Sequence, residues 1–240
     1  MRAIVFVAQG TEEMEFTIAY DVLVRGGIQV QSVYVPADGA PASPPEGFVR
    51  AARGVAIVPD TTLEQCAAAN HAYDLLVVPG GVGGADIISH NPIVLSMLRD
   101  AYAAGTWIGM ICAGSLAALE AQIGEHGGIT SHPSVADKLE KAYEYREEPV
   151  VVAKNLVTSR GPGTSFAFAL TLVEKLAGRE VRDQDTMAFF FFFFFFFFFF
   201  FIYLLLQGNA YLSLASLAHE MSSSPTTNES CDVALCFMAE

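Results

Sequence analysis

Basic side chains are scarce in this 240-residue chain and absent from its C-terminal part. The sequence has 13 Lys and Arg against 26 Asp and Glu, which gives a formal net charge of −13, and neither Lys nor Arg occurs after Ala188. A nucleic-acid surface needs a basic stripe, and attraction to anionic lipid needs clustered cations. The sequence therefore excludes both kinds of binding by charge and favours small or neutral partners.

Cysteine is also rare, and its pattern excludes common metal sites. Only Cys66 and Cys112 precede residue 189, while Cys231 and Cys236 follow it, and no CxxC pair occurs. No signal peptide is expected at the N-terminus, because the short apolar run 3–8 leads directly into polar residues. These features predict free thiols in the reducing cytoplasm and no metal.

The composition changes abruptly after Ala188, so we divide the chain into residues 1–188 and 189–240. Phe189–Phe201 is an unbroken phenylalanine run, and Phe189–Leu206 forms 18 uncharged apolar residues. Such a stretch is long enough to span a bilayer, which would make it a C-terminal anchor. Its low complexity also fits a translated thymine tract, with non-coding sequence behind it. We expect a membrane partner only if the anchor is real.

Residues 1–188 alternate between β-rich and helical patterns. Continuous apolar runs predict buried strands, and capping signals with glycine ends predict helices between them. The alternation predicts an α/β, doubly wound, mostly parallel sheet flanked by helices, with ligands at the carboxyl ends of the strands. The strands are expected at 3–8, 28–35, 55–58, 75–78, 107–111, 129, 150–152 and 156–157, and the helices at 13–25, 61–70, 91–104, 116–121 and 165–176.

Cys112 occupies the most informative position in this pattern. It follows a predicted strand and opens a helix, as nucleophiles do at a sharp strand-to-helix turn, where Gly114 lets the turn close. A thiol at a helix N-terminus is biased towards the thiolate. The alternative is a buried structural cysteine, because cysteine is among the most buried residue types.

The loops expected at the carboxyl ends of the strands are 10–15, 79–84 and 112–115. Besides Cys112, three features are candidates for chemistry. Glu15 can serve as a proton donor or acceptor, or simply favour the first turn of a helix. Gly80 and Gly81 can offer backbone N–H groups to an oxyanion, or form an ordinary turn. His132 can assist a thiolate, or belong to a loop before Pro133.

Together these segments resemble the DJ-1 branch of the DJ-1/PfpI superfamily, whose fold is flavodoxin-like and similar to class I glutamine amidotransferases. The resemblance extends from Met1 to about Arg182, and the third and fifth segments are its most specific parts. The matching segments are GTEEMEF at Gly10–Phe16, VVPGG at Val77–Gly81, ICAG at Ile111–Gly114, ITSHP at Ile129–Pro133 and TSRGPGTSFAFAL at Thr158–Leu170.

The resemblance implies a role for each matching residue. Cys112 corresponds to an oxidisable nucleophile, Glu15 to a protonated carboxyl that hydrogen-bonds its thiolate, and His132 to a nearby histidine. It also implies a homodimer, with one arginine reaching across the interface. The implied substrate-binding positions are the backbone N–H groups of Gly80, Gly81 and Ala113 and the side chains of Arg25, Arg53 and Arg160, with Pro162 in the same late loop.

The activity implied by the resemblance is a cofactor-free glyoxalase III-like or deglycase reaction on methylglyoxal, glyoxal and their early adducts. The alternative is a redox-sensing, chaperone-like protein that acts through oxidation of Cys112 to the sulfinate. A PfpI-type protease is disfavoured because Ala113 replaces the histidine that follows the nucleophile in those relatives. A metal site formed by Cys112, Glu15 and His132 lacks an obvious fourth ligand.

The sequence departs from the human-like members in four places. Ser115 replaces a proline and is expected to loosen the turn after the cysteine. The loop 37–48 is longer, and Val58 occupies a position that is cysteine in some members. The segment 184–188 leads into phenylalanines where those proteins have a further helix.

Overall fold

A computed structural model describes residues 1–68 and 72–184, and its centre is a seven-stranded sheet. The strands run in the order β10-β11-β7-β6-β1-β2-β5, and all neighbours are parallel except β10 and β11. Their bounds are Val150–Ala153, Leu156–Ser159, Trp107–Ile111, Leu75–Val78, Arg2–Val7, Gln29–Tyr34 and Thr61–Thr62. The predicted α/β, doubly wound, mostly parallel sheet is confirmed.

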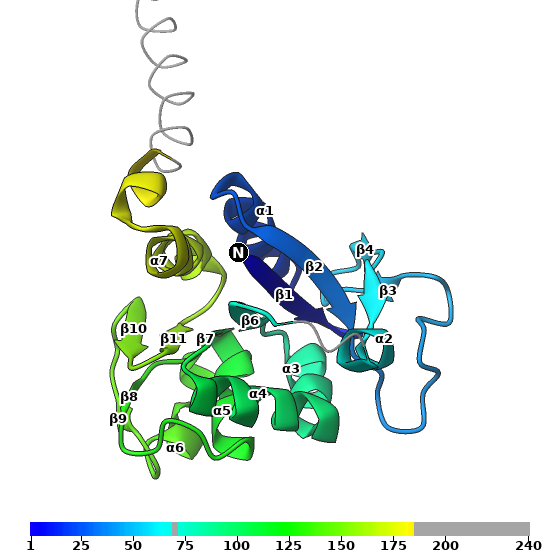
Figure 1. The fold of residues 1–240 in the computed structure, drawn as a ribbon. Helices are drawn as coiled ribbons and strands as arrows, with labels where there is room; N and C mark the ends of the chain where they lie inside the picture. The colour runs from blue at the N-terminus through cyan, green and yellow to red at the C-terminus, as the bar shows by residue number, and fades with distance from the viewer. Residues whose placement is uncertain (69–71, 185–240) are drawn as a thin grey trace, which may run out of the picture. The chain divides into compact units, whose positions relative to one another are not determined.

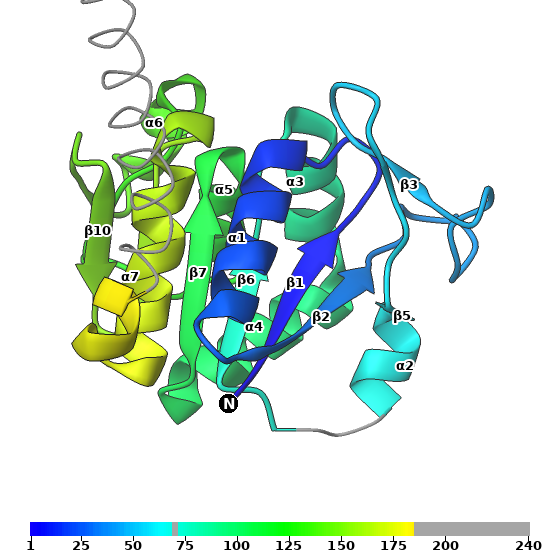
Figure 2. The ribbon, with the colours of Figure 1, turned by 90° about the horizontal axis from the view of Figure 1, so that it is seen from above.

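Helices cover both faces of this sheet, as Figures 1 and 2 show. Helices α1 (Glu13–Arg25) and α7 (Ser165–Ala177) pack side by side on one face. The other face carries α3 (Val82–His90), α4 (Pro92–Ala104), α5 (Leu116–Glu120) and α6 (Ala136–Leu139), and α2 (Leu63–Ala68) lies beside β5. Because both faces are covered, the central strands are apolar along their whole length.

Short elements connect these layers. The antiparallel pair β3 (Val49–Arg50) and β4 (Ala56–Ile57) follows the long loop 37–48, and β8 (Gly128–Ile129) pairs with β9 (Glu144–Tyr145). Three 3₁₀ turns, η1 (Cys112–Ser115), η2 (Pro133–Val135) and η3 (Pro162–Thr164), each lead directly into a helix.

Two sequence predictions of secondary structure were wrong. Thr61 and Thr62 pair with β2 as strand β5 instead of opening a helix, because pairing along β2 satisfies their backbone groups. Residues 82–84 were assigned to a loop, yet α3 begins at Val82. A Cβ on Gly84 would lie 2.5 Å from the Thr11 hydroxyl, so glycine is required where this helix packs on the turn after β1.

The C-terminal predictions fall mostly outside the described residues. Residues 179–184 are helical, and the tail 189–240 with its phenylalanine run belongs to the part that is not described. Within residues 1–68 and 72–184, no helix is both long and apolar enough to cross a bilayer.

The sheet topology determines where a ligand can bind. Strand β1 is central, and the chain adds β2 and β5 on one side of it before β6, β7 and β11 on the other. The order therefore reverses between β1 and β6, and ligands of such sheets bind at the carboxyl ends of the strands beside this reversal. The turns after β1, β6 and β7 meet there.

Candidate active site

Cys112 stands at the sharp turn that the sequence predicted. Its φ angle is 62°, in the left-handed region that non-glycine residues rarely adopt. Strand β7 fixes the residue from one side and η1 fixes it from the other. A Cβ on Gly114 would lie 2.6 Å from the carbonyl oxygens of Val78 and Pro79, so only glycine allows the turn to close against β6. The strained backbone holds the thiol at the strand end.

The Glu15 side chain is fully buried in the first turn of α1. Glu12, not Glu15, caps this helix, since its carboxylate accepts the Glu15 N–H at 2.8 Å. The Gly80 N–H donates to Glu15 Oε2 at 2.7 Å, and Oε1 has no hydrogen-bond partner in the described structure. Glu15 is therefore free of a capping role and faces Cys112, with which its side chain forms a hydrogen bond.

The Glu15 carboxyl and the Cys112 thiol affect each other's protonation. Burial raises the pKa of Glu15 to about 7, against the opposing effects of hydrogen bonds from Cys112 and Gly80. Burial also raises the pKa of Cys112 to about 12, and the charge of Glu15 adds to this rise. The pair thus loses its first proton near pH 7 and keeps the second well above neutrality. The sequence predicted that the helix N-terminus would lower the pKa of the Cys112 thiol. This prediction was wrong, because burial and the charge of Glu15 raise that pKa by more than the helix N-terminus lowers it.

Two backbone N–H groups face the sulfur of Cys112. Those of Ala113 and Gly81 hydrogen-bond to it and favour the thiolate. Their predicted contact with a substrate oxyanion stays a prediction. The same prediction was wrong for Gly80, because its N–H is donated to Glu15. Gly80 instead provides space, since a Cβ there would lie 2.6 Å from both the Cys112 Cβ and Glu15 Oε2.

His132 begins the η2 turn beside the cysteine. Its backbone N–H donates to the Cys112 carbonyl oxygen at 3.3 Å, and its ring nitrogen Nδ1 lies 2.8 Å from Ser134 Oγ. Ser115, expected to loosen the turn, instead donates its buried hydroxyl to the Thr130 carbonyl oxygen at 2.9 Å. This hydrogen bond ties the cysteine turn to the strand that leads to His132, so the expectation of loosening was wrong.

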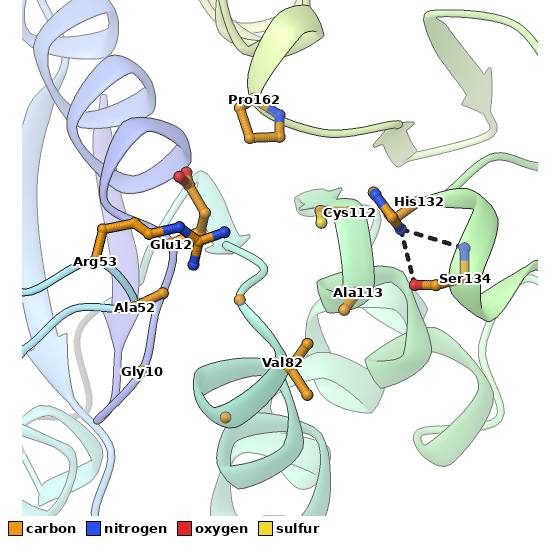
Figure 3. A pocket seen from close by; sticks show the side chains of 12 residues that line it. Gly10, Glu12, Ala52, Arg53, Val82, Cys112, Ala113, His132, Ser134 and Pro162 are labelled. Carbon is orange, nitrogen blue, oxygen red and sulfur yellow. Dashed lines mark hydrogen bonds between the residues drawn. The ribbon is translucent and has the colours of Figure 1, made fainter.

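The three predicted arginines have different positions. Arg53 lines the cavity at Cys112 (Figure 3). Its backbone N–H donates to the Glu13 carboxylate at 2.8 Å. The Arg160 side chain turns away to the Glu147 carbonyl oxygen at 3.1 Å, although Pro162 in the same loop lines the cavity. Arg25 lies at the far end of α1 from Glu15, roughly 15 Å along the helix, so its role at a pocket stays a prediction for the homodimer.

Cys112, His132 and Arg53 line a cavity of about 480 Å³. Its volume suits a small molecule, and Figure 3 shows Cys112 between His132 on one side and Arg53 across the opening. No group of His, Cys, Asp and Glu in residues 1–68 and 72–184 is arranged to hold a metal ion. The lining residues are Gly10, Glu12, Ala52, Arg53, Gly81, Val82, Gly83, Cys112, Ala113, His132, Ser134 and Pro162.

Several lining residues were not foreseen from the sequence. Ala52 follows β3, and Val82 and Gly83 open the unpredicted helix α3. Ser134 comes directly after the ITSHP segment and had no visible signal of its own.

Comparison with known proteins agrees with this geometry. The family model described as "DJ-1/PfpI family" matches residues 1–175. The chain belongs to the DJ-1/PfpI family. It is 40% identical to Drosophila melanogaster Protein dj-1beta over 74% of this chain and 90% of that protein. The crystal structure of Drosophila DJ-1beta superposes with a TM-score of 0.71 at 37% identity, covering 78% of this chain and 96% of the other.

Two relatives carry a name that states an activity. The glutathione-independent glyoxalase DJ-1 of Schizosaccharomyces pombe is 35% identical over 75% of this chain and 93% of that protein. The glutathione-independent glyoxalase DJR-1.2 of Caenorhabditis elegans is 37% identical over 72% of this chain and 86% of that protein. Both matches cover most of the relatives' own length.

Proposed function

We propose that this protein is a glutathione-independent glyoxalase, with deglycase activity on early adducts of the same aldehydes. The observation that carries the proposal is the fully buried Glu15 carboxyl, held by the Gly80 N–H beside the Cys112 thiol. Burial raises the pKa of this carboxyl to about 7. A nucleophile beside a group that exchanges protons at neutral pH is what isomerisation of a 2-oxoaldehyde needs. The names of the S. pombe and C. elegans relatives support the same activity.

The reaction begins with attack of the Cys112 sulfur on the aldehyde carbon of methylglyoxal. The carbonyl electron pair moves onto oxygen, which takes the proton shared by Glu15 and Cys112. The product of this step is a hemithioacetal. The N–H groups of Gly81 and Ala113, which lie beside the sulfur, stabilise the negative oxygen while it forms.

Glu15 then moves a proton between the two former carbonyl carbons. Its carboxylate removes the C–H proton of the hemithioacetal, which gives an enediolate. The hydroxyl proton of the first carbon passes to the oxygen of the second, and Glu15 returns its proton to that second carbon. The aldehyde carbon is thereby oxidised and the ketone carbon reduced within one molecule, so no redox cofactor takes part. Water cleaves the resulting thioester, which releases lactate and restores the Cys112 thiol.

The test is lactate formation from methylglyoxal without glutathione, using the full chain. Cys112→Ser is expected to abolish lactate formation while leaving the fold intact. Cys66→Ser is the matched control, because Cys66 is equally buried but bonds to Tyr73 at 3.3 Å, away from this cavity. Turnover that persists in Cys112→Ser would exclude the covalent mechanism.

Redox sensing through Cys112 is the weaker candidate. The residue is only 8% exposed, and its raised pKa disfavours the free thiolate that oxidants attack. Mild peroxide followed by mass spectrometry separates the two functions: oxygen added at Cys112 more readily than at Cys66 supports sensing, and equal oxidation of both excludes it.

We also propose that the protein acts as a cytoplasmic homodimer with small reactive aldehydes as substrates. Family membership supports the dimer, and free Cys66 and Cys112 fit a reducing compartment. Sedimentation analysis of the purified chain tests the dimer, because a purely monomeric protein at micromolar concentration contradicts it. Cell fractionation tests the location. A chaperone role would require suppression of aggregation of an unrelated unfolded protein.

A further inference from the structure

The ring of His132 is held in one orientation by Ser134. Its Nδ1 atom receives the backbone N–H of Ser134 at 3.2 Å and lies 2.8 Å from the Ser134 hydroxyl oxygen. A backbone N–H can only donate a hydrogen bond, so Nδ1 must present a lone pair. The neutral ring therefore carries its proton on the other nitrogen, Nε2.

That second nitrogen faces the reaction site. His132 and Ser134 line the same cavity as Cys112, and the His132 backbone N–H is bonded to the Cys112 carbonyl oxygen. In Figure 3 the hydrogen bonds to Ser134 leave from one side of the ring, while the free nitrogen lies on the side of Cys112 and Pro162. The ring thus directs an N–H donor, and no lone pair, towards a substrate on the sulfur.

We infer that His132 acts as a neutral hydrogen-bond donor through Nε2–H to a substrate oxygen, and that Ser134 is the positioning residue that selects this tautomer. The inference rests on the proposed glyoxalase function and narrows it. His132 joins Gly81 and Ala113 in stabilising the oxyanion, and the proton transfers between carbon atoms fall to Glu15 alone. This replaces the role of assisting a thiolate that the sequence suggested for His132.

The tautomer itself can be observed in the resting protein. Long-range proton–nitrogen correlation spectra of the full chain, with the His132 signals assigned by their loss in His132→Gln, distinguish a protonated Nε2 from a protonated Nδ1. We expect the Nε2–H form. A resting His132 protonated at Nδ1, or averaging between both forms, overturns the inference whether or not the protein makes lactate.

Kinetics test the donor role separately. Glutamine retains an N–H donor of similar reach but cannot relay a proton, so His132→Gln should keep kcat within about tenfold of the wild type. His132→Ala should lose about 10²-fold or more, as removal of an oxyanion donor does. Equal loss in both variants shows that the ring transfers a proton and overturns the inference. His90→Gln, at the exposed end of α3, is the matched control and should leave the rate unchanged.

Ser134→Ala removes the hydroxyl but keeps the backbone N–H. We expect kcat to fall by about 2- to 12-fold, the effect of one hydrogen bond, with KM little changed, and Ser134→Thr to restore it. A change in KM alone, or no rescue by threonine, contradicts the positioning role. If the wild type makes no lactate at all, the proposed function has failed. If the wild type makes lactate but His132→Gln and His132→Ala are equally inactive, only the role of His132 is refuted.

Discussion

Replacing Gly80 with alanine tests how tightly the structure places the Glu15–Cys112 pair. The added Cβ would lie 2.6 Å from the Cys112 Cβ, 2.6 Å from Glu15 Oε2 and 3.0 Å from Cys112 Sγ. These distances are about 1 Å shorter than an ordinary van der Waals contact, and the neighbours are fixed by β7 and α1. We expect overpacking to cost about 1–3 kcal/mol of stability. Displacement of the reacting groups by about 1 Å should lower kcat/KM by about 10²-fold.

The matched control is Gly163→Ala in the neighbouring turn η3, where an added Cβ meets no atom within 4 Å. Thermal unfolding and lactate formation are measured for both variants. The control should match the wild type in both assays. A Gly80→Ala protein with wild-type rate and stability would show that the two side chains are not held as closely as described, and the shared-proton mechanism would lose its geometric basis.

Four further predictions concern the same site. Lactate formation should rise with pH through about 7, as the Glu15–Cys112 pair loses its first proton; a rate that is flat between pH 5.5 and 8.5, roughly the span in which such a group titrates, contradicts this. The native state holds the Glu15 proton up to about pH 7, whereas the unfolded chain releases it near pH 4.5. The free energy of unfolding should therefore fall by about 3 kcal/mol as pH rises across this window. In denaturant titrations, the Glu15→Gln protein should lack this contribution to the fall in the free energy of unfolding, because glutamine cannot ionise. The same variant should make no lactate. Ser115→Ala leaves the Thr130 carbonyl without its buried donor and should cost about 1–3 kcal/mol; an unchanged unfolding midpoint would contradict the tie between the two loops. A chain ending at Ala188 should keep the wild-type rate, because every proposed site residue precedes it, and loss of activity without unfolding would assign a role to the tail.

The sequence by itself determined the sheet and the position of Cys112 at its edge. The apolar runs at 3–8, 75–78 and 107–111 became β1, β6 and β7 because strands buried on both faces of a parallel sheet need no polar positions. The helix 13–25 was predicted with its observed bounds, since it ends at a glycine and carries acidic residues in its first turn. Strand, sharp turn and helix in succession identified Cys112.

The tertiary structure alone decided which groups act on that cysteine. Gly83 and Gly84 have a poor helix propensity, so α3 was missed, yet its packing on Thr11 demands a residue without a side chain at Gly84. The N–H of Gly80 could serve an oxyanion or a carboxylate, and only the burial of Glu15 beside it makes it a partner of the carboxylate. Local patterns report propensity and periodicity, whereas the direction of an N–H group is set by elements far apart in the chain.

Contacts between segments far apart in the chain also explain the position of Arg25 and the wrong expectation for Ser115. Arg25 shares α1 with Glu15, but ten residues along the helix separate it from the cavity of its own chain, so its predicted role at a pocket depends on a homodimer. Ser115 reads as a small residue in a turn, and its stabilising role exists only because the Thr130 carbonyl lies opposite its hydroxyl. The sequence thus specified Cys112 and the sheet edge that carries it. Packing between distant segments set the protonation, the hydrogen bonds and the shape of the site around it.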